Sequence, residues 1–334
     1  MTKYSIFALG LLVAGSAAHA ETVLSVSNWT GAGQTQAVKE WCDLLGKNSS
    51  GKLRCNILPR PVSTPPGSFD AVANGVVDVS LTVHGYTPNR FVLTQMAEFP
   101  FNGDSAEAMS VAYDKVASKH PEFAQEHKGV HVLGYFTHGP GMVFNSKRRI
   151  AKIDDLEGLK FRVGGGMVNE IAKSLAMNVT LKPASDAYEL LSGGVMDGTL
   201  FPAESIEAYK LDKVIRYATY FPGGFYNISW VFMMNPARYS NLSLDEKKAV
   251  DSVSGEVVAR IFGRQWDTLD RNGRAVMEAS RIQVTTADPS FVADVKSRTS
   301  SLEQRWVKDA SARGTKDPGK ILAEFRKEIS ALQK

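Results

Sequence analysis

Short apolar runs alternate with amphipathic segments along the chain, and this alternation limits the fold more than any other sequence feature. The segment around Val38, Trp41 and Leu45 has apolar residues at helical spacing, whereas the runs before and after it have strand length. In the first part of the chain we predict strands at 23–27, 53–58, 76–83 and 130–135, and helices at 34–47, before Gly75 and at 105–118. Such alternation is typical of an α/β fold with a largely parallel sheet.

A second α/β unit begins near Gly139. Its predicted strands are 159–163, 179–181, a strand beginning at 195–198, 214–217 and 226–234, with helices at 167–176 and 185–191. The late chain is helical, and a capping box at Ser243–Glu246 begins a helix that we expect to continue to Val276, with only three glycines inside it. A helix of that length can lie across two domains. Two further amphipathic helices are predicted within 289–334.

The first twenty residues have the pattern of an export signal. Lys3 precedes an apolar run, Ile6–Ala14, and Ala18-His19-Ala20 is a cleavage site of small residues. A membrane anchor is the alternative, but this apolar run is too short to cross a bilayer. We therefore predict cleavage after Ala20 and a periplasmic protein. The chain has 334 residues and a net charge of +4, and the part after the signal is long enough for two domains. Nothing in it suggests nucleic-acid binding, because basic residues form no run.

Two cysteines, Cys42 and Cys55, form a candidate disulfide. Cys42 lies on the apolar stripe of a predicted helix and Cys55 on the apolar face of the next strand, so both point inward on adjoining elements. An even number of cysteines in an exported protein favours a disulfide. Two free buried thiols are the alternative. Either role is structural.

Arg162 lies on a predicted strand that ends in three glycines. Leu159, Phe161 and Val163 alternate with Lys160 and Arg162, which is the pattern of a half-buried strand, and Gly164–Gly166 follow. An arginine held on a rigid strand beside a tight turn suits a carboxylate. From these residues alone, an arginine on the solvent-exposed face of the strand is the favoured interpretation.

Motifs of catalysis, metal binding and phosphate binding are missing. The sequence contains no zinc-protease, serine-hydrolase or P-loop motif, and the histidines lack metal-ligand spacing. Nothing in the sequence argues for an enzyme, a cofactor or a metal site, so we expect none of these; a periplasmic enzyme is the alternative. His84 and His138 differ from the other histidines because each follows a strand and precedes a glycine, where ligands of α/β sheets bind. Each is a candidate for a pocket or for the core.

Several ordered motifs resemble the substrate-binding proteins of tripartite ATP-independent periplasmic (TRAP) transporters, the DctP-like family. The similar segments are 51–59, 75–80, 99–101, 145–150, 154–163, 184–198 and 242–278. The resemblance implies two α/β domains with a cleft between them, crossing strands and a long helix that spans both. It also implies capture of an organic anion for membrane subunits driven by an ion gradient. Arg162 falls on the family's carboxylate-binding arginine.

Two positions depart from the family pattern. Many members have a second arginine where this chain has Met142, and an asparagine where it has Phe201. A second ligand carboxylate would therefore be poorly paired in a closed cleft. This favours a monocarboxylate, such as a 2-oxo, hydroxy or aromatic acid. A C4-dicarboxylate and a sensor subunit that presents its ligand to a receptor are the alternatives.

The sequence thus predicts a two-domain solute-binding protein. We expect the first domain to comprise 21–138 and 227–265, and the second 139–226 and 266–334. The predicted ligand-binding residues are Arg162, Phe201, Met142, Trp29, Tyr86, His84, His138 and Tyr188.

Overall fold

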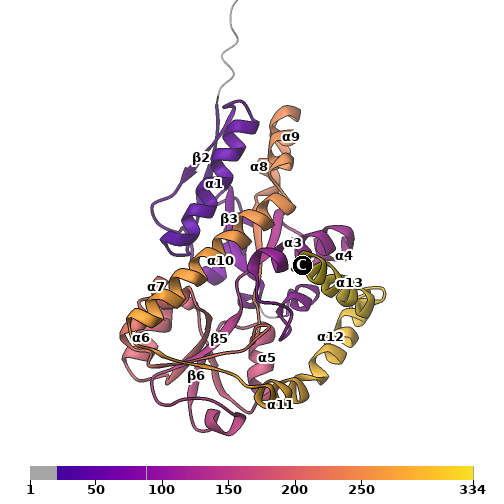
Figure 1. Cartoon of the computed structure of the whole chain (residues 1–334). Coiled ribbons are helices and arrows are strands. Elements are labelled where there is room, and N and C mark those ends of the chain that lie inside the picture. The colour runs from indigo at the N-terminus through magenta and orange to yellow at the C-terminus, as the bar shows by residue number, and fades with distance from the viewer. Residues whose placement is uncertain (1–20, 88, 334) are drawn as a thin grey trace, which may run out of the picture.

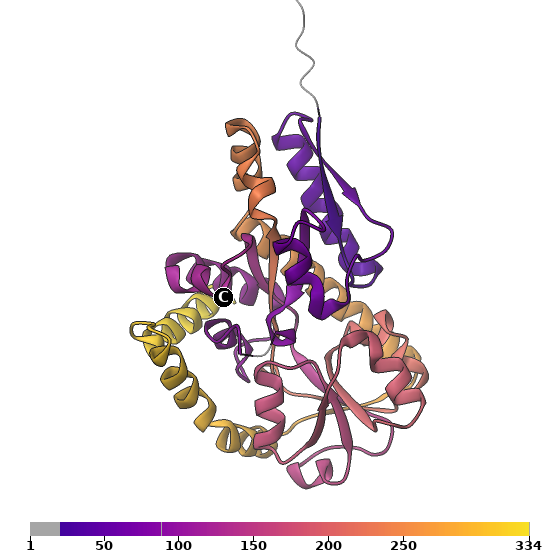
Figure 2. The ribbon, with the colours of Figure 1, turned by 180° about the vertical axis from the view of Figure 1, so that it is seen from behind.

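The computed structural model describes residues 21–87 and 89–333, so the predicted export signal lies outside the described residues. Two separate sheets organise these residues, with helices around them (Figures 1 and 2). The first sheet has the strand order β2 (Leu53–Ile57), β1 (Thr22–Ser27), β3 (Val79–Val83), β10 (Ser229–Met234) and β4 (His131–Thr137). The second has the order β11 (Gln283–Thr286), β9 (Tyr217–Tyr220), β5 (Gly141–Asn145), β8 (Gly198–Pro202), β6 (Lys160–Val163) and β7 (Asn178–Leu181).

Each sheet contains one strand that runs against its neighbours. Strand β10 is antiparallel to β3 and β4, and β5 is antiparallel to β8 and β9, while the remaining pairs are parallel. Both strands follow a crossing of the chain, from β4 to β5 and from β9 back to β10. The expectation of a largely parallel sheet is confirmed for the other strands, and β5 and β10 are the exceptions. Alternation along the sequence does not show where the chain changes domain, so it did not predict their reversed direction. The strand expected at 214–217 instead begins at Tyr217.

Helices cover the sheets. Those before residue 210 are α1 (Ala32–Asn48), α2 (Ser68–Ala73), α3 (Ala106–Lys119), α4 (Pro121–Glu126), α5 (Met167–Ser174), α6 (Ala187–Ser192) and α7 (Ser205–Ala208). Those after residue 235 are α8 (Pro236–Ser240), α9 (Leu244–Ser252), α10 (Glu256–Ala279), α11 (Pro289–Thr299), α12 (Ser301–Ala312) and α13 (Pro318–Leu332). None of these described helices is both long and apolar enough to cross a bilayer.

The long helix predicted from Ser243 to Val276 is two helices. The capping box at Ser243 is present and begins α9, but this helix ends at Ser252. Gly255 then adopts a φ of 62°, which favours glycine, and its N–H donates to the Leu133 carbonyl of β4 at 2.6 Å. A tertiary hydrogen bond thus breaks a segment whose local pattern is helical throughout.

Helix α10 nevertheless spans both domains (Figure 1). A Cβ at Gly263 would lie 2.6 Å from the Cα of Glu107 in α3, and one at Gly273 would lie 2.1 Å from the Ala203 carbonyl oxygen of the second domain. These glycines therefore allow the backbone of α10 to approach each domain closely. The Asp267 carboxylate of α10 also accepts hydrogen bonds from the first turn of α3, including the Ala106 N–H at 2.6 Å.

The C-terminal segment returns to the first domain. It contains three helices, not two, because Ser300 separates α11 from α12. Helix α11 packs against α5 of the second domain, whereas α13 packs against α3 of the first. The sequence placed all of 266–334 with the second domain, and the structure instead brings its last helix to the first (Figure 2).

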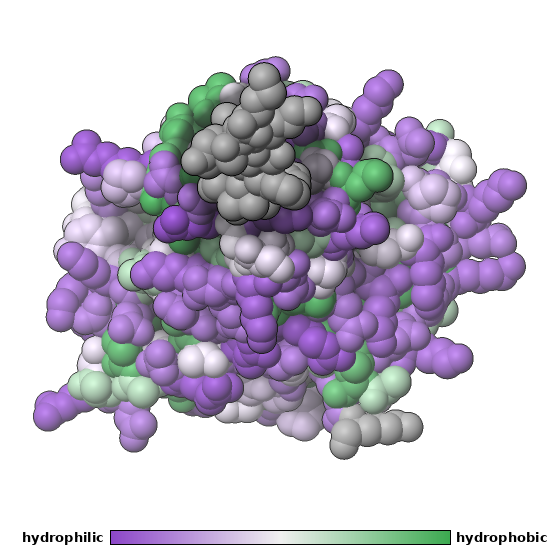
Figure 3. Space-filling model, turned by 90° about the horizontal axis from the view of Figure 1, so that it is seen from above, coloured by the Kyte–Doolittle hydropathy of each residue, from purple (hydrophilic) through white to green (hydrophobic). Residues whose placement is uncertain are grey.

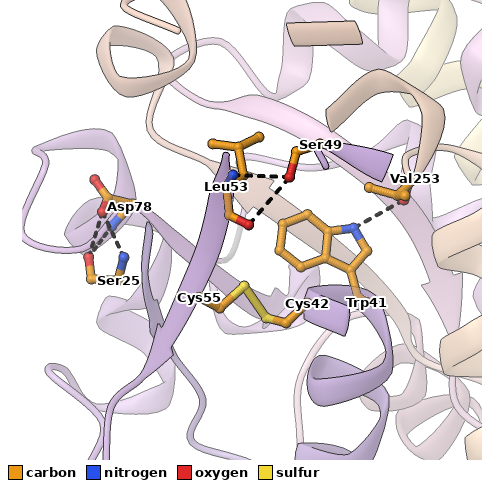
Figure 4. The surroundings of a disulfide bond; sticks show 8 residues. All are labelled: Ser25, Trp41, Cys42, Ser49, Leu53, Cys55, Asp78 and Val253. Carbon is orange, nitrogen blue, oxygen red and sulfur yellow. Dashed lines mark hydrogen bonds between the residues drawn. A yellow bond between two sulfur atoms is a disulfide. The ribbon is translucent and has the colours of Figure 1, made fainter. Parts of the chain in front are cut away.

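A disulfide joins Cys42 of α1 to Cys55 of β2, with 5.7 Å between the Cα atoms (Figure 4). Nearby, the indole N–H of Trp41 donates to the Val253 carbonyl at 3.0 Å, which ties α1 to the break before α10. Viewed from above, the outer surface is mostly hydrophilic, with small scattered apolar groups (Figure 3). The apolar side chains are instead concentrated in the interior, on both sheets and the inner helix faces.

Candidate ligand-binding site

A cavity of about 320 Å³ lies between the two domains, and residues of both sheets and of α10 line it. Its volume is within the range of small-molecule sites, which is roughly 300–1,000 Å³. The first domain contributes the segment 29–34 and residues of β3 and β10. The second domain contributes residues of β6, of β8 and of the segment after β8. A ligand in this cavity would contact both domains at once.

Arg162 is the cationic group of the cavity. Its side chain is only 1% exposed, and its Nε donates to the Lys182 carbonyl at 2.8 Å. The guanidinium carbon lies 4.3 Å from the ring centroid of Phe201, which is a cation–π contact. Among the described residues, no carboxylate forms an ion pair with Arg162, and no other lysine or arginine lines the cavity. A buried, unpaired guanidinium favours an anionic ligand.

The turn after Arg162 packs tightly against the first domain. Gly165 and Gly166 have φ values of 85° and 72°, and a Cβ at Gly85 would lie 2.7 Å from the carbonyl carbon of Gly165. Nearby, the hydroxyl of Tyr86 accepts a hydrogen bond from the Ala184 N–H at 3.0 Å, from one domain to the other. These contacts hold the two domains together beside the arginine.

Aromatic rings form much of the remaining wall. Trp29 stacks on Trp230 with 5.2 Å between ring centroids, and Phe201 stacks on Tyr209 at 5.5 Å. The first pair belongs to the first domain and the second pair to the second domain, and all four residues line the cavity. A planar apolar ligand body would therefore meet rings from both sides.

Two buried acids lie at the α10 end of the site. Glu204 lines the cavity, and its backbone N–H donates to Oδ1 of Asp270 at 2.9 Å. Burial, together with the nearby Asp270 carboxylate, raises the pKa of Glu204 to about 8. Burial also raises the pKa of Asp270 to about 7. This end of the site therefore offers no positive charge to a second carboxylate of the ligand.

Five of the eight predicted ligand-binding residues line the cavity, namely Arg162, Phe201, Trp29, Tyr86 and His138. The structure places the other three elsewhere. Met142 pairs with Phe201 across β5 and β8, but it is 2% exposed and belongs to the core of the second domain. Tyr188 of α6 is 39% exposed at the surface.

His84 is the third residue outside the cavity, and it belongs to a buried hydrogen-bond cluster that we call the Glu98 cluster: Glu98, Ser229, His84 and His127. His84 Nδ1 lies 2.9 Å from the Ser229 hydroxyl and its Nε2 lies 2.8 Å from Nε2 of His127. Glu98 accepts from the N–H and hydroxyl of Ser229 and from the Met167 N–H at the start of α5. This cluster therefore links the two domains without a ligand.

Several cavity residues gave no signal in the sequence. Trp230 lies in a strand whose residues are all buried, and Trp266 lies on the apolar stripe of α10, so both have the pattern of core residues. Gln34 is at the start of α1, and Glu204 follows β8. Only the arrangement of the two domains brings them together. In the part of the chain that the structure describes, no group of three or more His, Cys, Asp or Glu side chains could hold a metal ion.

Comparison with known proteins agrees with this architecture. Residues 27–309 match the model of the DctP family, bacterial extracellular solute-binding protein family 7. The chain therefore belongs to this family of solute-binding proteins, whose solved relatives serve TRAP transporters. Such proteins are transport components that bind small organic acids and work with membrane subunits.

Two similar solved structures contain aromatic acids. A TRAP periplasmic solute-binding protein of Bordetella bronchiseptica, with bound (R)- and (S)-mandelate, is 40% identical with a TM-score of 0.90, and the match covers 93% of this chain and 99% of that chain. A marine-metagenome TRAP protein specific for aromatic acid ligands, in complex with 3-hydroxybenzoate, is 29% identical with a TM-score of 0.87. This match covers 94% of this chain and 99% of that chain. The outer membrane transporter protein TsaT of Comamonas testosteroni is 31% identical over 278 residues, 83% of this chain and 82% of that protein.

Proposed function

We propose that this protein captures an aromatic monocarboxylate for a TRAP transporter, with Arg162 as the carboxylate anchor. The observation that carries this proposal is a buried guanidinium, without an ion pair among the described residues, in a cavity walled by aromatic rings. Its Nε is bonded to a carbonyl, so the two terminal nitrogens can bind a carboxylate in the bidentate geometry. The two similar structures with bound mandelate and 3-hydroxybenzoate support the same ligand class.

A dicarboxylate fits this cavity less well. Within the described residues, Arg162 is the one lysine or arginine of the lining, and Glu204 and Glu207 are acidic members of it. A second ligand carboxylate would lose its hydration without gaining a cation, which is unfavourable in a closed site.

Ligand binding would stabilise the closed arrangement of the domains. The anchor and Phe201 belong to the second domain, whereas Trp29 and Trp230 belong to the first. A ligand that contacts both sides has a higher affinity for the closed state, and this difference is what drives closure.

A thermal-shift and calorimetric panel tests the proposal. We expect benzoate, 3-hydroxybenzoate or mandelate to stabilise the protein, by about 2.7 kcal/mol at one hundred times the dissociation constant, and succinate and malate to do so weakly or not at all. Arg162→Ala should abolish binding of the aromatic acids. Lys160→Ala, on the same strand but exposed, is the matched control and should bind normally. Stabilisation by dicarboxylates alone, or normal binding by Arg162→Ala, would contradict the proposal.

Export through residues 1–20 completes the proposed function. Cleavage after Ala20 would release a mature chain beginning at Glu21, one residue before β1 begins. The mass of the protein recovered from the periplasm checks this, because retention of residues 1–20 would contradict it.

A further inference from the structure

Four buried residues of the cavity lining carry polar atoms without a hydrogen-bond partner. They are Gln34 (Nε2 and Oε1), His138 (Nε2), Trp230 (Nε1) and Trp266 (Nε1). Each of these four residues is only 3–4% exposed. None of the four belongs to the strands of the second sheet, which supply Arg162 and Phe201. The cavity thus has a cationic wall and a neutral polar wall.

The two tryptophans of this group differ from the other tryptophans of the chain. The protein has five tryptophans, all within the described residues. The indole N–H groups of Trp29, Trp41 and Trp306 donate to backbone carbonyls at 2.7–3.0 Å. Only Trp230 and Trp266 have unpaired N–H groups within 21–87 and 89–333, and both line the cavity. A buried donor left unpaired costs roughly 1–3 kcal/mol, so a partner that enters the cavity is strongly favoured.

Three of the four side chains, those of Trp266, Trp230 and His138, lie close to one another. The ring centroid of Trp266 lies 5.8 Å from that of Trp230 and 5.8 Å from that of His138. Gln34 is near the start of α1, and α1 packs against α10, the helix that carries Trp266. One small ligand group can therefore lie within reach of several of them.

Donors and acceptors occur together on this wall. Tryptophan N–H groups only donate, whereas the unpaired Oε1 of Gln34 only accepts. His138 Nδ1 contacts the Gly139 carbonyl, an acceptor, so this nitrogen carries the proton and Nε2 of the neutral ring is an acceptor. Burial lowers the pKa of His138 to about 4, which keeps the ring neutral at pH 7.

A hydroxyl group fits this wall best, because it donates one hydrogen bond and accepts others. A ketone or ether oxygen would leave the acceptors of Gln34 and His138 unpaired, and a carboxylate would find no cation there. We infer that the neutral wall selects a hydroxyl-bearing monocarboxylate over its deoxy analogue, and that Gln34, His138, Trp230 and Trp266 determine this selectivity. The inference rests on the proposed function, in which Arg162 binds the carboxylate.

Matched ligand pairs test the inference by isothermal titration calorimetry at pH 7. The pairs are 3-hydroxybenzoate with benzoate, 4-hydroxybenzoate with benzoate, and mandelate with phenylacetate. In at least one pair we expect the hydroxylated acid to bind at least about tenfold more tightly, because a site built for a hydroxyl rejects the analogue that lacks it. In Trp266→Phe and Gln34→Met the ratio should fall by at least about fivefold, mainly through weaker binding of the hydroxylated acid.

Trp306→Phe is the matched control, because its indole N–H is paired with the Val92 carbonyl away from the cavity. This variant should keep the ratio of the unmodified protein. Equal affinities within every pair, or a ratio that survives in both Trp266→Phe and Gln34→Met, would overturn the inference and leave the Arg162 proposal standing. Binding of neither member of any pair would contradict both proposals.

Discussion

Two buried polar groups lie between the domains, and they differ in whether the protein satisfies its own hydrogen bonds. In the Glu98 cluster, every side chain has a partner, and the set connects Phe123, Ser229 and the Met167 N–H. In the cavity, Arg162 has no ion pair and Trp230 and Trp266 have unpaired N–H groups, as judged over the described residues. The first group links the two domains, and we propose that the second binds the ligand. These two groups thus differ in hydrogen-bond satisfaction, although some buried atoms outside both, such as Tyr113 Oη, also lack a partner among the described residues.

His84 and His138 show the difference most clearly. Both follow a strand and precede a glycine, so the sequence treats them alike. The structure places His84 against Ser229 and His127, whereas Nε2 of His138 has no partner among the described residues and the ring lines the cavity. The same local pattern therefore has opposite uses, and only tertiary contacts decide between them.

The largest effect on stability is expected from Glu98→Ala. This change removes the acceptor of the Ser229 and Met167 N–H groups and leaves both buried. We expect a loss of about 3 kcal/mol in the free energy of unfolding, measured by urea denaturation. Glu98→Gln should cost less, because one acceptor oxygen remains. A loss below about 1 kcal/mol for Glu98→Ala would show that the cluster does not link the domains.

Arg162→Met should have the opposite profile. It removes a buried charge that has no ion pair within the described chain, so the free energy of unfolding should change by less than about 1 kcal/mol. Binding of an aromatic acid should nevertheless be lost in calorimetry. Strong destabilisation of the ligand-free variant would mean that Arg162 serves the fold, as Glu98 does.

The histidine pair gives a smaller effect. His84→Phe should lower the free energy of unfolding by about 2 kcal/mol, because it disrupts the Glu98 cluster. Ligand affinities should be unchanged, because His84 does not line the cavity. His138→Phe should change stability by less than about 1 kcal/mol and reduce the preference for the hydroxylated acid. Urea denaturation and calorimetry on both variants separate the two roles, and a reversed result would contradict the comparison.

The stability should also depend on pH through Glu204. Its pKa in the folded protein is about 8, above the value of an unfolded glutamate, so the folded state holds this proton more tightly. The contribution of Glu204 to the free energy of unfolding is therefore fully present below about pH 4. It is lost as the pH rises towards 8, by at most about 1.4 kcal/mol per pH unit. Between pH 6.5 and 8, Glu204→Gln should show a shallower loss than the unmodified protein. If the free energy of unfolding falls equally with pH in both proteins, Glu204 is already ionised in the folded state.

The sequence predicted much of the fold because periodicity and family motifs are local signals. The strand that carries Arg162, the capping box at Ser243 and the two-domain layout are all present. The break at Gly255 was missed because its cause is a hydrogen bond to Leu133, which is remote in sequence. The antiparallel β5 and β10 were missed for a related reason, since alternation does not show where the chain crosses between domains.

The site was predicted in part, and the misses share one physical cause. Arg162 and Phe201 stand on strands whose motifs mark them. Trp230 and Trp266 have the periodicity of core residues, and they are indeed buried. Their unpaired N–H groups exist only in the folded arrangement. Periodicity predicts burial but not whether a buried polar atom has a partner.

A crystal structure with the tightest-binding hydroxylated aromatic acid tests the central claim most directly. We predict the carboxylate within hydrogen-bond distance of the Arg162 guanidinium, about 2.7–2.9 Å, and the hydroxyl bonded to at least one unpaired atom of Gln34, His138, Trp230 or Trp266. The Glu98 cluster should keep its own hydrogen bonds. A carboxylate bound away from Arg162, with the cavity atoms still unpaired, would contradict the account.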